Sequence, residues 1–175
     1  MTSQLRVEHV QPSPPEIALH PFDVPTTPTE VWRSDDGTVR VEAVAVHHEP
    51  VPEAVAFRVT TPDGVVVISG DTRVCDEVAE LATDADVLVH EVCRASKLRD
   101  AVAGSPLERI FEYHADSVAL GGLAARARVG HLVLTHLIPA PNGAEHEAAF
   151  ESDVREGGYD GRVTVGVDLA AVTIG

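Results

Sequence analysis

Three short apolar runs, each followed at once by polar side chains, constrain the fold of this chain more than any other feature. The runs are Val65–Ile68 before Ser69-Gly70-Asp71-Thr72, Val87–Val89 before His90-Glu91, and Leu132–Leu134 before Thr135-His136. Runs that are apolar on both faces are typical of strands inside a sheet, and in open α/β sheets ligands gather at the carboxyl ends of such strands. We therefore expect the three endings to share one crevice.

The patterns around these runs predict an α/β fold. A hairpin region comes first, with two-residue alternation from Val39 to Ala45, a partner strand over 54–60 and a turn at Thr61-Pro62-Asp63-Gly64. Helices are expected over 74–82, 116–128 and 145–155, and they alternate with strands over 65–68, 86–90 and 131–135. Two terminal strands are expected over 163–167 and 170–174. The order predicts a mixed sheet with flanking helices.

The first part of the chain is rich in proline. Six prolines lie within residues 1–31, and because proline lacks a backbone donor and blocks helix, this part is expected to be extended or irregular. We therefore divide the chain into an extended segment, residues 1–37, and a globular unit, residues 38–175.

The composition argues against several classes of function. Twenty-eight acidic and 13 basic residues give a formal charge of -15, which disfavours non-specific binding to nucleic-acid phosphates. No stretch approaches the roughly 20 apolar residues of a membrane span, and the first 15 residues lack a secretory signal pattern. A cytoplasmic location without a membrane partner is expected. Cys75 and Cys93 form no Cys-x-x-Cys motif and are expected to be buried thiols.

Two of the strand endings supply candidate metal ligands. Asp71 stands at a tight strand-to-loop corner where a carboxylate can reach a metal, and the alternative is that it caps the next helix. His136 ends its strand shortly before Pro139; its neutral imidazole could bind zinc, or it could bond to backbone at a sheet edge. His131, five residues earlier on the opposite strand face, is expected to be structural.

Glu91 and His114 are candidates for a proton-handling pair. A carboxylate that accepts from one imidazole nitrogen raises the histidine pKa and orients the other nitrogen toward a substrate. The alternative is that His114 merely precedes Asp116, the expected N-cap of the 116–128 helix. His47 and His48 are expected on opposite faces of a strand, so at most one of them serves the crevice.

Together these motifs resemble the C-terminal half of the metallo-β-lactamase superfamily, in its ribonuclease Z and arylsulfatase-like branch. The resemblance covers about residues 38–175 and rests on an ordered series of segments: His48-Glu49-Pro50-Val51-Pro52, Ser69-Gly70-Asp71-Thr72, Leu88-Val89-His90-Glu91, His114 at the start of a helix, and Leu134-Thr135-His136-Leu137. The ordered series is far more specific than any one motif. It implies half of a four-layer αββα sandwich.

The resemblance also implies roles for individual residues. Asp71 would bridge two metal ions and His136 would be a terminal ligand of one, while Glu91 and His114 would stabilise developing charge or protonate the leaving oxygen. His48 would contact substrate. The cofactor would be two zinc ions, or manganese or another divalent ion, and metal-activated water would hydrolyse a phosphodiester, sulfate ester or related ester.

One departure from the family pattern limits these expectations. Family members carry His-x-His-x-Asp-His before the aspartate strand, and none of the nine histidines here forms His-x-His. Two protein ligands rarely hold zinc tightly, because catalytic sites generally supply three. The chain alone is therefore expected to be inactive, and a complementary N-terminal half or a homo-oligomer is the expected partner.

Three interpretations remain open from the sequence. The first is the metal-dependent hydrolase, acting on a small ester or on RNA, with the acidic charge favouring the small ester. The second is a non-catalytic remnant or interaction module that keeps the half-fold. The third is an unrelated doubly wound binding domain in which Asp71 is a helix cap.

Overall fold

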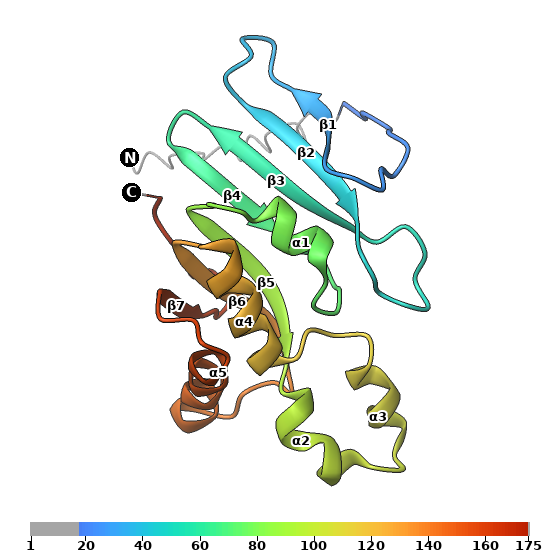
Figure 1. Cartoon of the computed structure of the whole chain (residues 1–175), viewed down its shortest axis with the longest axis vertical. Helices are drawn as coiled ribbons and strands as arrows, with labels where there is room; N and C mark the ends of the chain where they lie inside the picture. Colours follow the sequence, from blue (N-terminus) through green and yellow to red (C-terminus); the bar gives the residue numbers. More distant parts are fainter. Residues whose placement is uncertain (1–17, 175) are drawn as a thin grey trace, which may run out of the picture.

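The computed structural model of this chain describes residues 18–174, which form a seven-stranded mixed sheet with helices packed on one face (Figure 1). The strands are β1 (Thr29–Arg33), β2 (Arg40–Ala45), β3 (Val55–Thr61), β4 (Gly64–Ile68), β5 (Val87–Cys93), β6 (His131–Ile138) and β7 (Arg162–Val165). The helices are α1 (Asp76–Leu81), α2 (Ala95–Val102), α3 (Pro106–Phe111), α4 (Ser117–Ala127) and α5 (Ala144–Glu156). The strands are ordered in space as they are in sequence.

The sheet changes character at β4. Strands β1 to β4 pair antiparallel, and β4 to β7 pair parallel. The predicted turn between β3 and β4 is present, and Gly64 adopts a φ of +146° there. An added Cβ at Gly64 would lie 2.6 Å from the Asp86 carboxylate, so this corner requires glycine.

The parallel half explains why the helices lie on one side. Strands β4 to β7 are sequential neighbours, and right-handed crossovers between such neighbours place every connecting helix on the same face. Helices α1, α4 and α5 form this layer (Figure 1). Their apolar side chains pack on those of the central strands; the fully buried members include Val67, Leu88, Leu132, Leu120, Leu123 and Phe150. One sheet with one helix layer is half of an αββα sandwich, as predicted.

Irregular segments from the two ends of the described chain lie on the other face of the sheet. The ring of Phe22 meets that of Phe57 edge-on at 6.2 Å between centroids. Ala170 and Val172 line a groove with Val89 of β5 and Val133 of β6, whose backbones are already paired on both sides. The strand predicted over 170–174 is therefore wrong, because this segment crosses the sheet face where no strand edge is free.

Most other predicted elements are confirmed. The helices expected over 74–82, 116–128 and 145–155 are α1, α4 and α5, and the strand expected over 163–167 is β7. The sequence patterns missed β1, α2 and α3. Strand β1 lies within the segment 1–37, of which residues 1–17 are outside the described part, so the proposed domain division stays a prediction. Among the described residues, no helix is both long and apolar enough to span a bilayer.

Candidate metal and proton-transfer site

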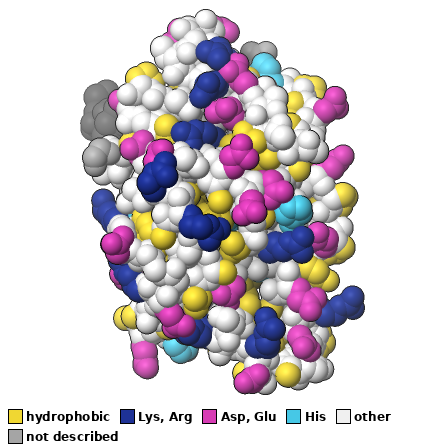
Figure 2. Space-filling view, viewed as in Figure 1, with side chains coloured by type: hydrophobic (Ala, Val, Ile, Leu, Met, Phe, Trp, Pro, Cys, Tyr) yellow, Lys and Arg dark blue, Asp and Glu magenta, His cyan; other side chains and the backbone are white. Residues whose placement is uncertain are grey.

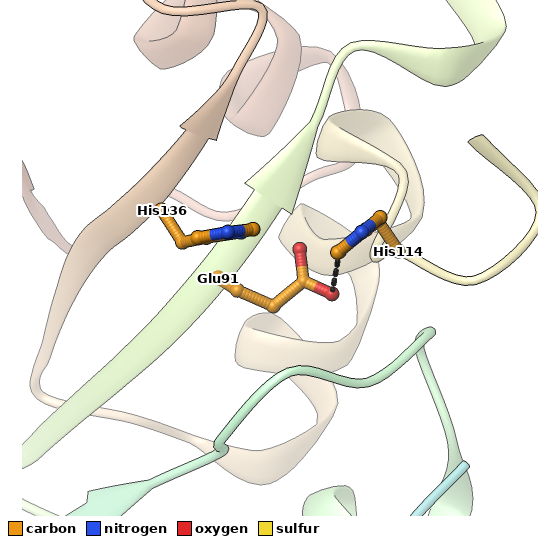
Figure 3. Close-up of side chains that lie close together, drawn as sticks. All are labelled: Glu91, His114 and His136. Atoms are coloured by element: carbon orange, nitrogen blue, oxygen red, sulfur yellow. Dashed lines mark hydrogen bonds and ion pairs between the residues drawn. The ribbon is translucent and has the colours of Figure 1, made fainter. Parts of the chain in front are cut away.

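The carboxyl ends of the parallel strands bring three chemically active side chains together. Glu91 lies near the end of β5, His136 near the end of β6, and His114 in the loop before α4. Each offers one potential ligand atom, and these atoms all lie within 4.8 Å of one another (Figure 3). The strand endings that carry Glu91 and His136 thus lie close together, as the sequence predicted.

Asp71, in the loop after β4, lies at the open side of this cluster. Its Oδ2 atom is 3.8 Å from Nε2 of His136, and both side chains are about half exposed, at 43% and 48%. The alternative that Asp71 caps α1 is wrong, because Cys75 is the N-cap residue of that helix and makes no side-chain cap bond. His136 adopts a left-handed φ of +44°, next to a register shift between β5 and β6.

The Glu91 carboxylate is buried and its two oxygens differ. Oε1 accepts three hydrogen bonds: from Nδ1 of His114 at 3.1 Å, from the Thr72 N–H at 3.1 Å and from the Ala115 N–H at 3.0 Å. Oε2 is buried and has no hydrogen-bond partner among the described residues. A buried carboxylate oxygen without a donor is costly, so this atom marks the place where a cation or a donor belongs.

The bond to Glu91 sets both the protonation and the tautomer of His114. The pKa of His114 is raised above its ordinary value, first by this hydrogen bond and further by the charges of Glu91 and Asp71, while burial opposes the shift. Since Oε1 of Glu91 accepts, the proton of the neutral ring is assigned to Nδ1. Nε2, the other ring nitrogen, takes no part in the bond to Glu91.

His48 completes a row of three imidazoles. Its ring centroid lies 5.0 Å from that of His114, which in turn lies 5.2 Å from that of His136. The Nδ1 atom of His48 donates to the Tyr113 carbonyl at 3.3 Å, so its Nε2 atom takes no part in this bond. His47, in contrast, bonds to Glu77 at 3.2 Å.

The Asp116 carboxylate bonds to the starts of two helices, one through each of its oxygens. Asp116 is the N-cap of α4, as predicted, and accepts from the N–H groups of Val118 and Ala119 through one oxygen. Its other oxygen accepts from the Ser96 N–H at the start of α2. The cap and the Glu91 bond therefore coexist, and His114 is more than a residue that precedes a cap.

The remaining strand histidines lie outside the cluster. His90 is fully buried, and burial lowers its pKa below the ordinary value. His131 bonds to the Thr164 hydroxyl at 2.8 Å. The sequence reasoning missed the Thr72 and Ala115 N–H donors to Glu91; the only signal for the first was its place directly after Asp71.

The donor set fits part of a divalent metal site. Two ligands bound at about 2.0–2.1 Å in tetrahedral geometry are roughly 3.3 Å apart, so the 3.8 Å separation of Asp71 and His136 needs only a small side-chain movement. Carboxylate and imidazole are ordinary zinc ligands, but zinc sites use three or four of them. Asp71 and His136 can thus hold an ion together with further ligands.

The chain is similar to ribonucleases Z. A protein of Mycobacterium tuberculosis (strain CDC 1551 / Oshkosh), provisionally named ribonuclease Z, is 35% identical over 165 residues, which are 93% of this chain and 68% of that protein. The chain belongs to the ribonuclease Z family. It matches the C-terminal part of this relative, as the sequence motifs predicted.

No family model matches the chain, but a second relative agrees with this assignment and solved structures share the fold. The ribonuclease Z of M. tuberculosis H37Rv is also 35% identical over 93% of this chain, which spans 56% of that ribonuclease Z. Human tRNase Z, short form, superposes with a TM-score of 0.55 at 22% identity, over 83% of this chain and 46% of its own. The metallo-β-lactamase fold protein YhfI of Bacillus subtilis superposes with a TM-score of 0.57 at 22% identity, over 77% of this chain and 48% of its own. The fold is that of the metallo-β-lactamases.

Proposed function

We propose that this chain is the C-terminal part of a metal-dependent phosphodiesterase of the ribonuclease Z type. In this proposal Asp71 and His136 bind the metal. His114, oriented by Glu91, transfers a proton to the leaving oxygen, and His48 contacts the substrate. The observation that carries the proposal is the buried Glu91 carboxylate, which holds His114 through one oxygen and leaves the other without a partner beside His136. A cluster of these residue types at the carboxyl ends of strands is typical of a catalytic site.

A divalent metal at Asp71 and His136, zinc by family or manganese in its place, would supply a water of lowered pKa and neutralise charge on the phosphoryl oxygens. The Asp71 carboxylate suits this role because it is partly exposed and lies 3.8 Å from the imidazole. The exposure of both side chains leaves the position accessible to additional ligands.

The proton step falls to His114. Glu91 keeps the ring oriented through Nδ1 and favours the protonated imidazole, so Nε2–H is available to the leaving oxygen of the ester. Burial of Glu91 keeps water from competing for that bond. His48, next in the row of rings, is placed to contact a phosphoryl oxygen or the leaving group.

We infer that further ligands come from a segment carrying His-x-His-x-Asp-His, the motif that the family resemblance implies before the aspartate strand. The chain spans 68% of one relative and 56% of another. The sheet face without helices among the described residues keeps apolar side chains in contact with solvent, such as Ile68 at 43% and Trp32 at 37% exposure. Covering such a face by a second sheet is favourable.

RNA is the substrate that the family suggests, and a small ester is the alternative. On the face seen in Figure 2, basic and acidic side chains are interspersed. Many of the described cations are paired with carboxylates, including Arg94 with Asp153 and Arg128 with Asp84. We therefore propose that phosphate-binding cations for RNA come mainly from the complementary segment. A cytoplasmic location stays a prediction.

The proposal is tested by complementation. The chain is co-expressed with the N-terminal region of the ribonuclease Z of M. tuberculosis H37Rv, which is the region before the matched part. Cleavage of a precursor tRNA and of a model phosphodiester is then measured in the presence of zinc. We expect cleavage by the pair only, with a loss of about 100-fold or more in Asp71→Ala and His136→Ala. His146→Ala, an exposed histidine of α5, is the control.

Cleavage that survives Asp71→Ala would overturn the assigned site. A folded, associated pair that cleaves neither substrate would instead favour the non-catalytic interaction module.

A further inference from the structure

The buried carboxylate of Asp153, on α5, belongs to none of the sequence motifs that form the metal and proton-transfer site. The Asp153 side chain is only 5% exposed. Its oxygens accept from Arg94 at 2.7 and 3.2 Å and from the Ser117 hydroxyl at 2.8 Å. The guanidinium of Arg94 also lies 5.8 Å from the centroid of the Phe150 ring.

These contacts join the three elements that carry the site. Arg94 directly follows β5, three residues after Glu91, and its N–H donates to the Ile138 carbonyl at the end of β6. Ser117 is the first residue of α4, three residues after His114. One carboxylate thus connects the ends of the segments that present Glu91, His114 and His136.

We propose that Asp153 and Arg94 are positioning residues, which hold the His114 loop, the end of β5 and the end of β6 in the geometry that lets His114 bond to Glu91. Their catalytic consequence rests on the proposed function. Their effect on the geometry of the histidine rings does not depend on that function, so the two can be tested independently.

The chemistry of the network suits positioning better than stabilisation. A buried ion pair loses much of its Coulomb energy to desolvation, so it contributes little to stability relative to apolar packing. A bidentate guanidinium–carboxylate pair, however, fixes both distance and orientation. The Ser117 bond extends that fixed geometry from α5 to the start of α4.

An exposed ion pair between α2 and α5 offers a matched control. Lys97 of α2 bonds to Glu156 of α5 at 2.6 and 2.7 Å, and Glu156 is 58% exposed. This ion pair connects α2 with α5 but reaches no segment of the site. Exposed ion pairs of this kind contribute little to the stability of the fold.

The test is histidine side-chain NMR of the full chain at one fixed pH, comparing wild type with Asp153→Asn, Ser117→Ala and Glu156→Gln. A histidine whose Nδ1–H bonds a carboxylate gives a downfield proton signal. We expect loss or a clear shift of the His114 signal in Asp153→Asn and Ser117→Ala, with the His136 ring signals also shifted in Asp153→Asn. We expect wild-type ring signals in Glu156→Gln.

Unchanged His114 and His136 ring signals in a folded Asp153→Asn variant would overturn the positioning role, even if its unfolding temperature fell. Equal shifts in Glu156→Gln would overturn it too, because they would reflect general loosening of α2 and α5. If Asp153→Asn does not fold, Ser117→Ala decides by the same criteria, since it removes only the bond to α4.

Discussion

His114 Nδ1 lies 3.1 Å from Oε1 of Glu91, and that oxygen also accepts from the backbone N–H of Ala115, the residue after His114. One carboxylate therefore holds both the imidazole and the loop that carries it. The bond raises the pKa of His114, so the ring keeps its proton to a higher pH than a free histidine does.

Glu91→Gln should weaken this coupling. Without the carboxylate charge the pKa of His114 falls, and a rate that needs protonated His114 then declines at lower pH than in the wild type. We expect a loss of about 10²–10⁴-fold at neutral pH in the complemented enzyme. The pH–rate profile checks this; a decline at unchanged pH would contradict the role of His114 as the acid.

Arg58 should stabilise the fold through the end of α1. Its Nη1 atom donates to the carbonyls of Leu81 at 2.6 Å and Thr83 at 3.1 Å, which satisfies groups left open where the helix ends. Arg58→Ala should lower the free energy of unfolding by about 1–2 kcal/mol, measured in urea. Arg128→Ala, which removes an exposed ion pair with Asp84, should leave it nearly unchanged.

Two adjacent glycines of α4 should respond oppositely to alanine. A Cβ at Gly121 would overlap the Val154 carbonyl of α5, so Gly121→Ala must separate the helices and should cost about 1–3 kcal/mol or more. At Gly122 the nearest atom is the Gly157 carbonyl oxygen at 3.5 Å, and there alanine should stabilise by up to about 1 kcal/mol. Equal effects on thermal unfolding would refute the close packing of α4 and α5.

The chain should lose stability as pH falls from 6.5 to 5.5. The pKa of His131 is lowered by burial and by the Arg162 charge, so the unfolded state binds its proton first and folding weakens below the ordinary value near 6.5. His90, buried and likewise lowered, acts in the same direction. The pKa of His114 is raised, so its contribution to stability is already complete below about pH 6.5. It therefore changes the free energy of unfolding little between pH 6.5 and 5.5.

His131→Gln isolates this effect, because glutamine can still bond to Thr164 but does not titrate. Its free energy of unfolding should fall less steeply over that pH range than the wild type's. Parallel slopes would show that His131 is not responsible.

Local patterns predicted the helices and strands that carry the site, because their apolar periodicity and the Asp116 cap are written in neighbouring residues. They failed where long-range contacts decide. Residues 170–174 look like a strand but lie across the sheet face. Helices α2 and α3 are short and bury little apolar surface, so neither gives a long apolar run. The donors that fix Glu91 come from backbone 19 and 24 residues away, which no local pattern reveals.

We propose that Asp71 and His136 are part of a metal site that further ligands complete. Zinc binding measured by calorimetry, for the chain alone and for its complex with the N-terminal region of the relative, tests it most directly. We predict no stoichiometric binding by the chain alone, tight binding by the complex, and a loss of that binding in Asp71→Ala. Tight zinc binding that is the same with and without Asp71, or no zinc binding by a well-formed complex, would rule out this metal site.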